Sequence, residues 1–220
     1  MKIQSLCAEV GEKNTQMVLI LLTPSMQPQK ITTEQRIKET ARKVFLVEGK
    51  IHATTEDIGK AAGLPRTSIH YYFRTRDALF RQVFLEALEE LTEKVYRVTA
   101  LDMPFRDKIE KFIEVWLSYS LNYPYLDTFV ITEIINQQYE PVDQRAARRM
   151  KLFLKEIGDA MEDGVIRKMD PMQFVLNLFA LLRYPCVASP LYIKLFGIKQ
   201  AHYRRLLKER KDVILRVLFP

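Results

Sequence analysis

The chain has 220 residues, of which 48% are hydrophobic and 28% are charged, with only 7 Gly and 10 Pro. This composition excludes a disordered or collagen-like chain and predicts a folded globular protein. The formal net charge is +7, and residues 30–81 carry eleven Lys or Arg against six Asp or Glu, so a polyanionic partner is expected to bind there.

The two cysteines, Cys7 and Cys186, share no C-x-x-C spacing with each other or with a histidine. Neither a disulfide framework nor a zinc site is predicted from them, and we expect a cytoplasmic protein without a metal or other cofactor. No apolar run approaches the roughly 18 to 20 residues that span a bilayer, so no membrane partner is expected.

Helical periodicity dominates from Thr32 onward, and no run of alternating β-branched residues with hairpin turns interrupts it. The predicted fold class is therefore all-α. Residues 1–29 lack sustained periodicity and contain two prolines, so a loosely ordered N-terminal extension is expected there. We expect residues before about Lys30 to be dispensable, with Met26 as an alternative start.

Four helices are predicted in the first part of the chain, at residues 33–47, 56–62, 65–73 and 76–101. The fourth is the longest of them. Gly49 is expected to stop the first helix. Thr54 or Thr55 is expected to cap the second, and Thr75 the fourth.

Prolines at 104, 124, 141, 171, 185 and 190 punctuate the rest of the chain, and each is expected to start or break a helix. The predicted helices between them are residues 105–121, 125–138, 142–164, 172–187, 191–196 and 199–219. We expect a DNA-binding domain at residues 30–80 and a larger helical domain at residues 81–220.

Residues 58–69, with the sequence IGKAAGLPRTSI, have the pattern of a helix-turn-helix. Two helices that cross steeply need a small residue at the close approach and a turn residue that tolerates positive φ. Gly59 and Gly63 meet these two needs, and Ile69 provides an apolar anchor under the second helix. A plain helical hairpin in an all-α core is the alternative interpretation of this glycine spacing.

The neighbouring residues favour the helix-turn-helix. Thr55-x-x-Ile58 through Gly63, followed by IHYYFRTRDALF at residues 69–80, resembles the TetR/AcrR family of bacterial transcriptional regulators. The resemblance is detailed for about fifty residues, from Thr33 to about Val83. It implies a three-helix DNA-binding head joined to a larger helical body that dimerises and often holds an inducer. His70 departs from the family, in which Tyr is commoner at this position.

Contacts with duplex DNA are expected from the start of the second helix of the motif, from the aromatic run that ends it, and from two helix N-termini. For the tyrosines a purely structural role is the alternative, and for the flanking arginines a solvated surface position. The expected DNA-binding residues are Thr55, Arg66, Thr67, Ser68, His70, Tyr71, Tyr72, Arg74, Thr75 and Arg76.

The body is rich in large side chains on adjoining helices, which favours a largely apolar ligand site. A plain helical core is the alternative for any one of them. Arg183 interrupts an apolar helix and needs a partner, such as Glu133, a group of a second subunit, or an anionic ligand. The expected ligand-binding residues are Trp116, Tyr119, Tyr123, Phe129, Gln137, Phe153, Phe174 and Arg183.

The last two long helices carry apolar stripes wider than one intramolecular contact requires. The family resemblance assigns such helices to the dimer interface, and burial inside one subunit is the competing interpretation. The expected interface residues are Phe174, Leu178, Leu181, Leu206, Val213, Ile214 and Val217.

These features predict a homodimeric regulator that binds an operator in double-stranded DNA as a repressor and is released by a small, largely apolar effector. A regulator of the same fold that responds to a protein partner, or to no ligand, is the alternative. An enzyme is not expected, because the three histidines are scattered and no Gly-rich phosphate loop or Ser-His-Asp order accompanies them.

Overall fold

The computed structural model describes residues 31–135 and 144–219, and no strand occurs within these ranges. The predicted all-α fold is confirmed. The chain separates into two units, residues 1–33 and 34–220, and the following description concerns the second. The predictions for residues 1–29, including Met26, and for Gln137 lie outside the described residues.

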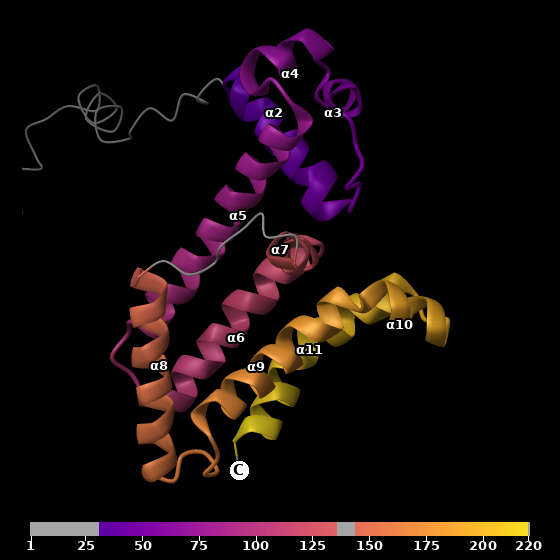
Figure 1. Ribbon diagram of the computed structural model, residues 1–220. Helices are drawn as coiled ribbons and strands as arrows, with labels where there is room; N and C mark the ends of the chain where they lie inside the picture. The colour runs from indigo at the N-terminus through magenta and orange to yellow at the C-terminus, as the bar shows by residue number, and fades with distance from the viewer. Residues whose placement is uncertain (1–30, 136–143, 220) are drawn as a thin grey trace, which may run out of the picture. The chain divides into compact units, whose positions relative to one another are not determined.

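Three short helices form a head, namely α2 (Thr33–Arg42), α3 (Thr55–Ala62) and α4 (Arg66–Phe73), coloured indigo to purple in Figure 1. The last turn of the first predicted helix is π-helical, from Lys43 to Val47. Apolar side chains from all three helices meet in the core of the head, where Ile37, Phe45, Ile58 and Ile69 are buried. The helices cannot bury these faces alone, so the head folds as one packed element.

Helix α5 (Arg76–Thr99) connects the head to the helical body. Thr75 caps it as predicted, because its Oγ accepts a hydrogen bond from the Ala78 amide at 3.1 Å. Leu79, Phe80 and Val83 in its first half are buried, as are Phe84, Ala87 and Leu91 further on. One continuous helix therefore packs against the head at its start and against the body along the rest of its length.

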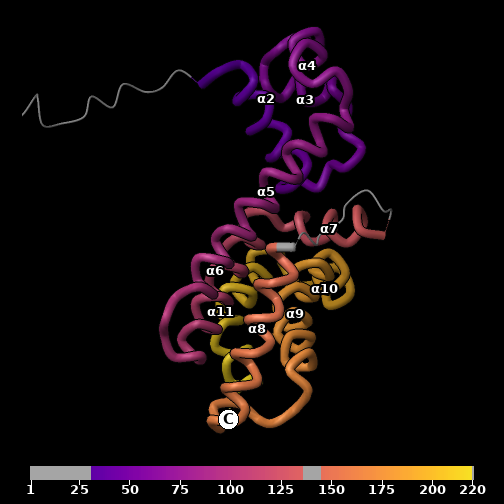
Figure 2. The backbone as a smooth tube through the Cα atoms, turned by 60° about the vertical axis from the view of Figure 1, so that its left-hand side comes forward, coloured from indigo at the N-terminus to yellow at the C-terminus, as the bar shows by residue number. Residues whose placement is uncertain are grey.

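The body contains α6 (Phe105–Asn122), α7 (Leu126–Ile135), α8 (Gln144–Glu162), α9 (Pro171–Val187), α10 (Ser189–Phe196) and α11 (Gln200–Leu218). In it, α9 contacts α6, α8 and α11, and α6 contacts α5 (Figure 2). These bounds agree with the predicted ones to within a few residues, except that the predicted helix end at residue 138 and helix start at residue 142 lie outside the described residues. No single described helix is long and apolar enough to cross a membrane. Helices α9 and α10 reach that length and apolar composition only when taken together, and they are bent by 61° relative to each other.

Pro185 lies inside α9 and does not break it, so the expectation of a helix start or break at this proline is wrong. Proline has no N–H and leaves the carbonyl four residues earlier without its helical donor. Here that carbonyl belongs to Leu181, and Arg210 of α11 donates to it through Nε at 2.8 Å. The Pro185 carbonyl in turn accepts from the Tyr203 hydroxyl at 2.7 Å. Helix α11 thus supplies the donor that the proline removes.

The head also contacts the body through α7. The Tyr125 amide donates to the Leu46 carbonyl at 3.2 Å, and a Cβ at Gly49, where φ is +68°, would lie 2.4 Å from the Tyr125 ring. Arg42 of α2 pairs with Glu90 of α5 at 3.1 Å. These contacts hold the end of the first head helix against both α5 and α7.

Candidate nucleic-acid interface

The glycines of the helix-turn-helix have the roles predicted from the sequence. A Cβ at Gly59 would lie 2.9 Å from the Leu64 carbonyl oxygen, which is a backbone atom and cannot rotate away. Gly63 ends α3 with φ +63°, in the left-handed region. Helix α3 can therefore carry no larger residue than glycine where the turn crosses it.

Helix α3 begins with a capping box formed by Thr54 and Asp57. The Asp57 amide donates to Thr54 Oγ1 at 3.2 Å, and the Thr54 amide donates to Asp57 Oδ2 at 2.8 Å. The hydrogen bonds from the Thr54 amide and then from its hydroxyl lower the pKa of Asp57 below its ordinary value. Of the two threonines proposed as caps, Thr54 is the cap, while Thr55 occupies the first helical position and is buried.

Helix α4 presents the side chains that were predicted to face outward. Arg66, Thr67, His70 and Tyr71 are exposed and Ser68 is half-buried, whereas Ile69 and Phe73 point into the core of the head. Tyr71 is 81% exposed, and its ring meets that of Tyr72 edge to face at 5.1 Å. The exposed face therefore combines a guanidinium, hydroxyls and a phenol, all of which can donate hydrogen bonds to DNA.

Two side chains of this face, Arg66 and His70, are tied to each other and to the backbone at the end of α4. Arg66 Nε donates to His70 Nε2 at 3.0 Å, and His70 Nδ1 lies 2.7 Å from the Arg74 carbonyl oxygen. Arg74 follows α4 with φ +56° and is the one non-glycine residue with positive φ in the described ranges. His70, the departure from the family pattern, therefore connects the start of α4 to the turn at its end.

Arg76 is placed differently from the sequence prediction. Its Nη1 pairs with Asp77 at 2.7 Å, its Nη2 donates to the Ile51 carbonyl, and its guanidinium lies 5.1 Å above the Phe45 ring. The same group lies 5.1 Å above Phe80. Arg76 therefore joins the loop before α3 to the start of α5, and its expected contact with phosphate stays a prediction.

Arg183 finds its partner within the chain, at Asp127 of α7 and not at Glu133. Arg183 Nε lies 3.4 Å from Asp127 Oδ1, and the guanidinium packs over the rings of Trp116 and Phe179 at 4.5 and 4.8 Å. Burial raises the pKa of Asp127, against the opposing effect of the Arg183 charge, and burial likewise lowers the pKa of Arg183. The pair joins α7 to α9 beside α6.

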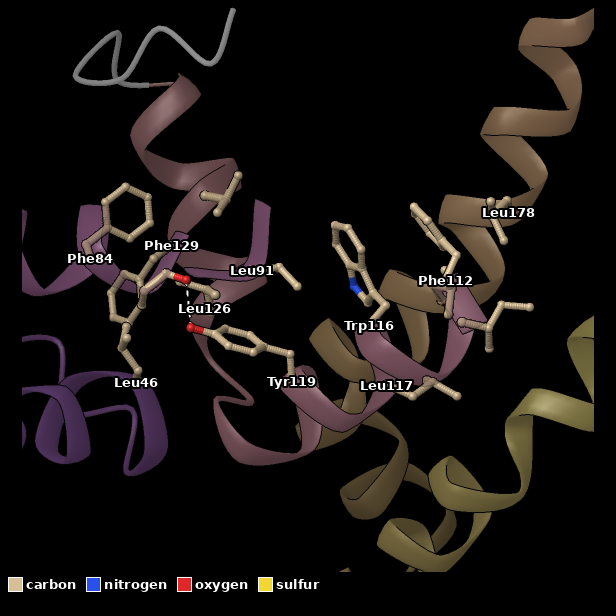
Figure 3. Packing of buried hydrophobic residues seen from close by; sticks show 14 of the residues in the cluster. Leu46, Phe84, Leu91, Phe112, Trp116, Leu117, Tyr119, Leu126, Phe129 and Leu178 are labelled. Atoms are coloured by element: carbon tan, nitrogen blue, oxygen red, sulfur yellow. Dashed lines mark hydrogen bonds between the residues drawn. The ribbon is translucent and has the colours of Figure 1, made fainter. Parts of the chain in front are cut away.

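The other predicted ligand residues do not gather at one site. Tyr119 and Phe129 lie together, away from Trp116 and Phe112 along α6 (Figure 3). The Tyr119 hydroxyl donates to the Ala87 carbonyl at 2.7 Å, and Phe129 packs on Phe80 at 5.0 Å. Burial, followed by the nearby Glu90 carboxylate, raises the pKa of Tyr119 well above its usual value.

Two further residues are also set apart from any common site. Tyr123 accepts from Arg42 of the head at 3.4 Å, and Phe174 packs between Phe105 and Phe219 at the other end of α6. Tyr119, Tyr123 and Phe129 thus hold α6 and α7 to α5 and the head, and Phe174 is a core residue. A ligand site that includes them is not supported by these positions.

A different group of residues surrounds an apolar cavity of about 180 Å³ between α5, α6, α8 and α9. Phe153 is the one residue of the predicted set that lines it. Trp116 lies one layer behind, stacked on Phe112 at 5.8 Å and edge-on to Phe179 at 5.3 Å. The sequence signal was the cluster of aromatic residues, but only helix packing reveals which of them share a cavity. The lining residues are Thr92, Val95, Tyr96, Thr99, Phe112, Ala146, Arg149, Met150, Phe153 and Phe179.

The predicted interface stripes are divided by burial. Phe174, Leu178 and Ile214 have no exposed surface, so they belong to the core of one subunit and the prediction is wrong for them. Leu181 is half-buried against the core. Leu206, Val213 and Val217 of α11 are between 41% and 62% exposed, and α9 exposes three more apolar side chains, Met172, Leu176 and Tyr184.

Cys186 is buried in the body and is not placed as a reactive thiol. Burial raises the pKa of the Cys186 thiol to about 11, so it remains protonated, and it donates to the Leu182 carbonyl at 3.5 Å. No group of three or more His, Cys, Asp or Glu side chains in residues 31–135 and 144–219 is arranged to hold a metal ion.

Comparison with known proteins relates the helix-turn-helix and the helical body to known regulators. Residues 37–83 match the family of bacterial regulatory proteins described as the tetR family. Over 158 residues the chain is 24% identical to the uncharacterized HTH-type transcriptional regulator YhgD of Bacillus subtilis. The aligned region covers 70% of this chain and 80% of that protein.

Solved structures share the fold over most of the chain at low identity. The ketosteroid transcriptional regulator KstR2 of Mycobacterium tuberculosis has a TM-score of 0.64 at 13% identity, covering 86% of this chain and 96% of its own. The fatty acid degradation regulator FadR of Bacillus halodurans has a TM-score of 0.56 at 16% identity, covering 83% and 94%. In its helix-turn-helix the chain is similar to the tetR family of bacterial regulatory proteins, and its helical body shares the fold of transcriptional regulators of that family.

Proposed function

We propose that the protein is a homodimeric repressor that binds a two-fold symmetric operator and is released from it by a small, largely apolar ligand. The observation that carries the DNA-binding part is the exposed face of α4, on which Arg66, Thr67, His70 and Tyr71 stand over a buried Ile69 and Phe73. The N-terminal residues of such a helix reach base edges in the major groove.

Dimerisation is supported by the exposed apolar side chains of α9 and α11. Leu176 and Tyr184 on the first helix, and Val213 and Val217 on the second, are each more than 40% exposed, and the two helices pack against each other. An apolar surface that spans two adjacent helices is typical of a subunit interface. Two copies joined there would present two recognition helices to two half-sites.

The ligand part is supported by the cavity between α5, α6, α8 and α9. Thr92, Val95, Tyr96 and Thr99 of α5 line this cavity, and Leu79 and Phe80 at the start of the same helix pack in the core shared with the head. At 180 Å³ the cavity lies below the roughly 300 to 1,000 Å³ of common ligand sites. The ligand is therefore compact, or it widens the cavity by displacing α5 or α8.

Such a displacement would change the DNA affinity. A movement of α5 shifts the head, and half-sites at fixed spacing no longer meet both recognition helices. A 100-fold loss of DNA affinity requires a coupling free energy of about 2.7 kcal/mol between the two sites. Binding of the operator must then lower the affinity for the ligand by the same factor.

The DNA-binding proposal is tested by fluorescence anisotropy on a duplex selected from a random pool. Thr67→Ala is expected to cost roughly 1 to 3 kcal/mol mainly on the selected duplex, and Arg74→Ala to weaken binding to all duplexes alike. Equal binding of the selected and a scrambled duplex by the unaltered protein at physiological salt would contradict the proposal.

The ligand proposal is tested with a library of compact apolar compounds, first by thermal shift and then by titration with and without operator. A ligand that binds the native state raises the melting temperature with concentration, and here it is expected to bind less tightly when DNA is present. Phe153→Ala is expected to abolish the shift. Equal affinity with and without operator would instead favour a regulator that responds to a protein partner or to no ligand.

A further inference from the structure

We infer that Arg66 reads a guanine in each half-site and that His70 is the residue that positions it, an inference that rests on the proposed DNA-binding function. The starting point is the hydrogen bond from Arg66 Nε to His70 Nε2, at 3.0 Å. An exposed arginine normally samples many rotamers, but this one is held by a neighbour on the same face of α4, four residues away.

The histidine has only one protonation state that fits its two contacts. The Arg74 carbonyl oxygen, 2.7 Å from Nδ1, can only accept a hydrogen bond. Nδ1 therefore carries the proton, and Nε2 of the neutral ring keeps the lone pair that accepts from Arg66. The two contacts select the same tautomer, so each supports the other.

The position of the Arg74 carbonyl depends on the turn that ends α4. Arg74 has φ +56° and ψ −52°, and its amide donates to the His70 carbonyl at 3.1 Å. A non-glycine residue at positive φ costs of order 1 kcal/mol or more. The turn places the carbonyl oxygen of Arg74 at the edge of the His70 ring, 2.7 Å from Nδ1.

The contact to His70 determines which donors of Arg66 remain for DNA. With Nε engaged, the terminal Nη1 and Nη2 groups are left, and no ion pair occupies them within residues 31–135 and 144–219. Two parallel N–H donors match guanine, which presents two acceptors, O6 and N7, in the major groove. Adenine presents one acceptor and one donor there, so it satisfies only one of them.

A base contact fits the place of Arg66 in the fold better than a phosphate contact. Arg66 is the first residue of α4, and the first turn of a recognition helix approaches base edges. Loss of a phosphate contact would lower the affinity for every sequence and reduce the salt dependence, whereas loss of a guanine contact would change the preference at one base position.

The experiment begins with sequences selected by the unaltered dimer, which are expected to contain a guanine at symmetric positions of both half-sites. Replacing that guanine by adenine is expected to weaken binding by roughly 5- to 150-fold. In Arg66→Ala this discrimination is expected to vanish with an unchanged preference at the other positions.

The role of His70 is tested in the same assay with His70→Phe, which keeps an aromatic ring but removes the acceptor. The guanine-to-adenine discrimination is expected to fall by roughly 3- to 10-fold, the net worth of one hydrogen bond, with no change in the salt dependence. In the Arg66→Ala background His70→Phe is expected to have no further effect on discrimination. His52→Phe, at an exposed histidine of the loop before α3, is the matched control, and circular dichroism checks that each variant is folded.

An independent measurement is the tautomer of His70 from long-range ¹H–¹⁵N NMR spectra of the free protein, which has only three histidines. The signals assigned by their loss in His70→Phe are expected to show the Nδ1–H form. An Nε2–H form, or a discrimination that survives Arg66→Ala, would overturn the inference while leaving specific DNA binding intact. A failure to select any sequence would instead refute the proposed function itself.

Discussion

Gly59 shows how one residue can be read from the sequence with its physical reason. The requirement for a small side chain at the crossing of α3 and the turn follows from the spacing IGKAAG, and the Leu64 carbonyl lies where a Cβ would have to go. The same motif predicted Ile69 as the apolar anchor of the second helix, and Ile69 is buried. Residues fixed by local geometry are predictable because the constraint lies within a few positions of the chain.

Gly59→Ala is therefore expected to lower the free energy of unfolding, because the added methyl would lie 2.9 Å from a backbone oxygen. The matched control is Gly158→Ala in α8, where a Cβ would meet no atom within 4 Å. This second change is expected to stabilise the protein by about 0.5 to 1 kcal/mol, since alanine favours a helix more than glycine. Urea unfolding monitored by circular dichroism measures both. A Gly59→Ala variant as stable as the parent would contradict the close approach.

The capping box of α3 gives a prediction for pH. Asp57 has a lowered pKa in the folded protein, so its stabilising contribution is present above the ordinary value near 3.9 and is lost as the pH falls through the lower folded value. Thr54→Ala is expected to cost about 1 kcal/mol at pH 7. The difference between parent and variant in urea unfolding is expected to shrink as Asp57 becomes protonated. A difference that stays constant down to pH 2 would argue against the capping box.

Other residues could not be placed from the sequence because their partners are distant. Arg76 stands beside the tyrosines in sequence, yet its guanidinium turns inward onto Phe45 and the Ile51 carbonyl. Arg183 pairs with Asp127, 56 positions earlier in the chain. The periodicity of the sequence shows that a charged residue lies on an apolar helix face and needs a partner. Which group is that partner depends on how the helices pack.

At the scale of elements, helix boundaries were predictable and helix faces only partly so. The apolar stripes of α9 and α11 were found from periodicity, but Phe174, Leu178 and Ile214 face α6 and the core while Val213 and Val217 face outward. An apolar stripe indicates that one face of a helix is buried. It does not show whether that face packs against the same chain or against a second subunit. The cavity was missed for the same reason, since Phe112 and Phe179 line it from helices that are distant in sequence.

The proline inside α9 leads to a prediction about paired elements. Arg210→Met removes the donor to the Leu181 carbonyl, which Pro185 cannot replace. The expected loss is about 0.5 to 1.5 kcal/mol in the free energy of unfolding, the usual net worth of one hydrogen bond, because the acceptor is only partly buried. Restoring the helical N–H with Pro185→Ala is expected to make the Arg210→Met change much less costly. A double-mutant cycle in urea tests this, and strictly additive effects would contradict the compensation between α9 and α11.

At the scale of the whole molecule, α5 is the element that connects the head to the body. Its 24 residues span about 36 Å, with the cap at Thr75 next to α4 and the cavity at Thr92 to Thr99. Lys38 and Arg42 of α2 pair with Glu86 and Glu90 of the same helix at 2.8 and 3.1 Å. The head is therefore attached to α5 along two turns, and a tilt of α5 would carry the head with it.

The apolar surface on α9 and α11 gives a prediction about assembly. Val217→Glu places a charge on a side chain that is 62% exposed in one chain and that we expect to be buried between two. Sedimentation is expected to show a shift from dimer to monomer together with loss of operator affinity, because a single half-site remains. Thr132→Glu, at an exposed position of α7, adds the same single charge away from this surface and is the control. A Val217→Glu protein that remains dimeric would remove this surface from the interface.

The most direct test of a dimeric regulator that reads DNA through α4 is the sequence and stoichiometry of the complex. We expect a random duplex pool selected with the protein at physiological salt to yield a two-fold symmetric consensus. Its half-sites are expected to be centred one helical repeat, about 34 to 36 Å, apart or a multiple of it, with an even number of chains on each duplex. An enriched sequence without two-fold symmetry, bound by a single chain, or no enriched sequence at all, would contradict the account.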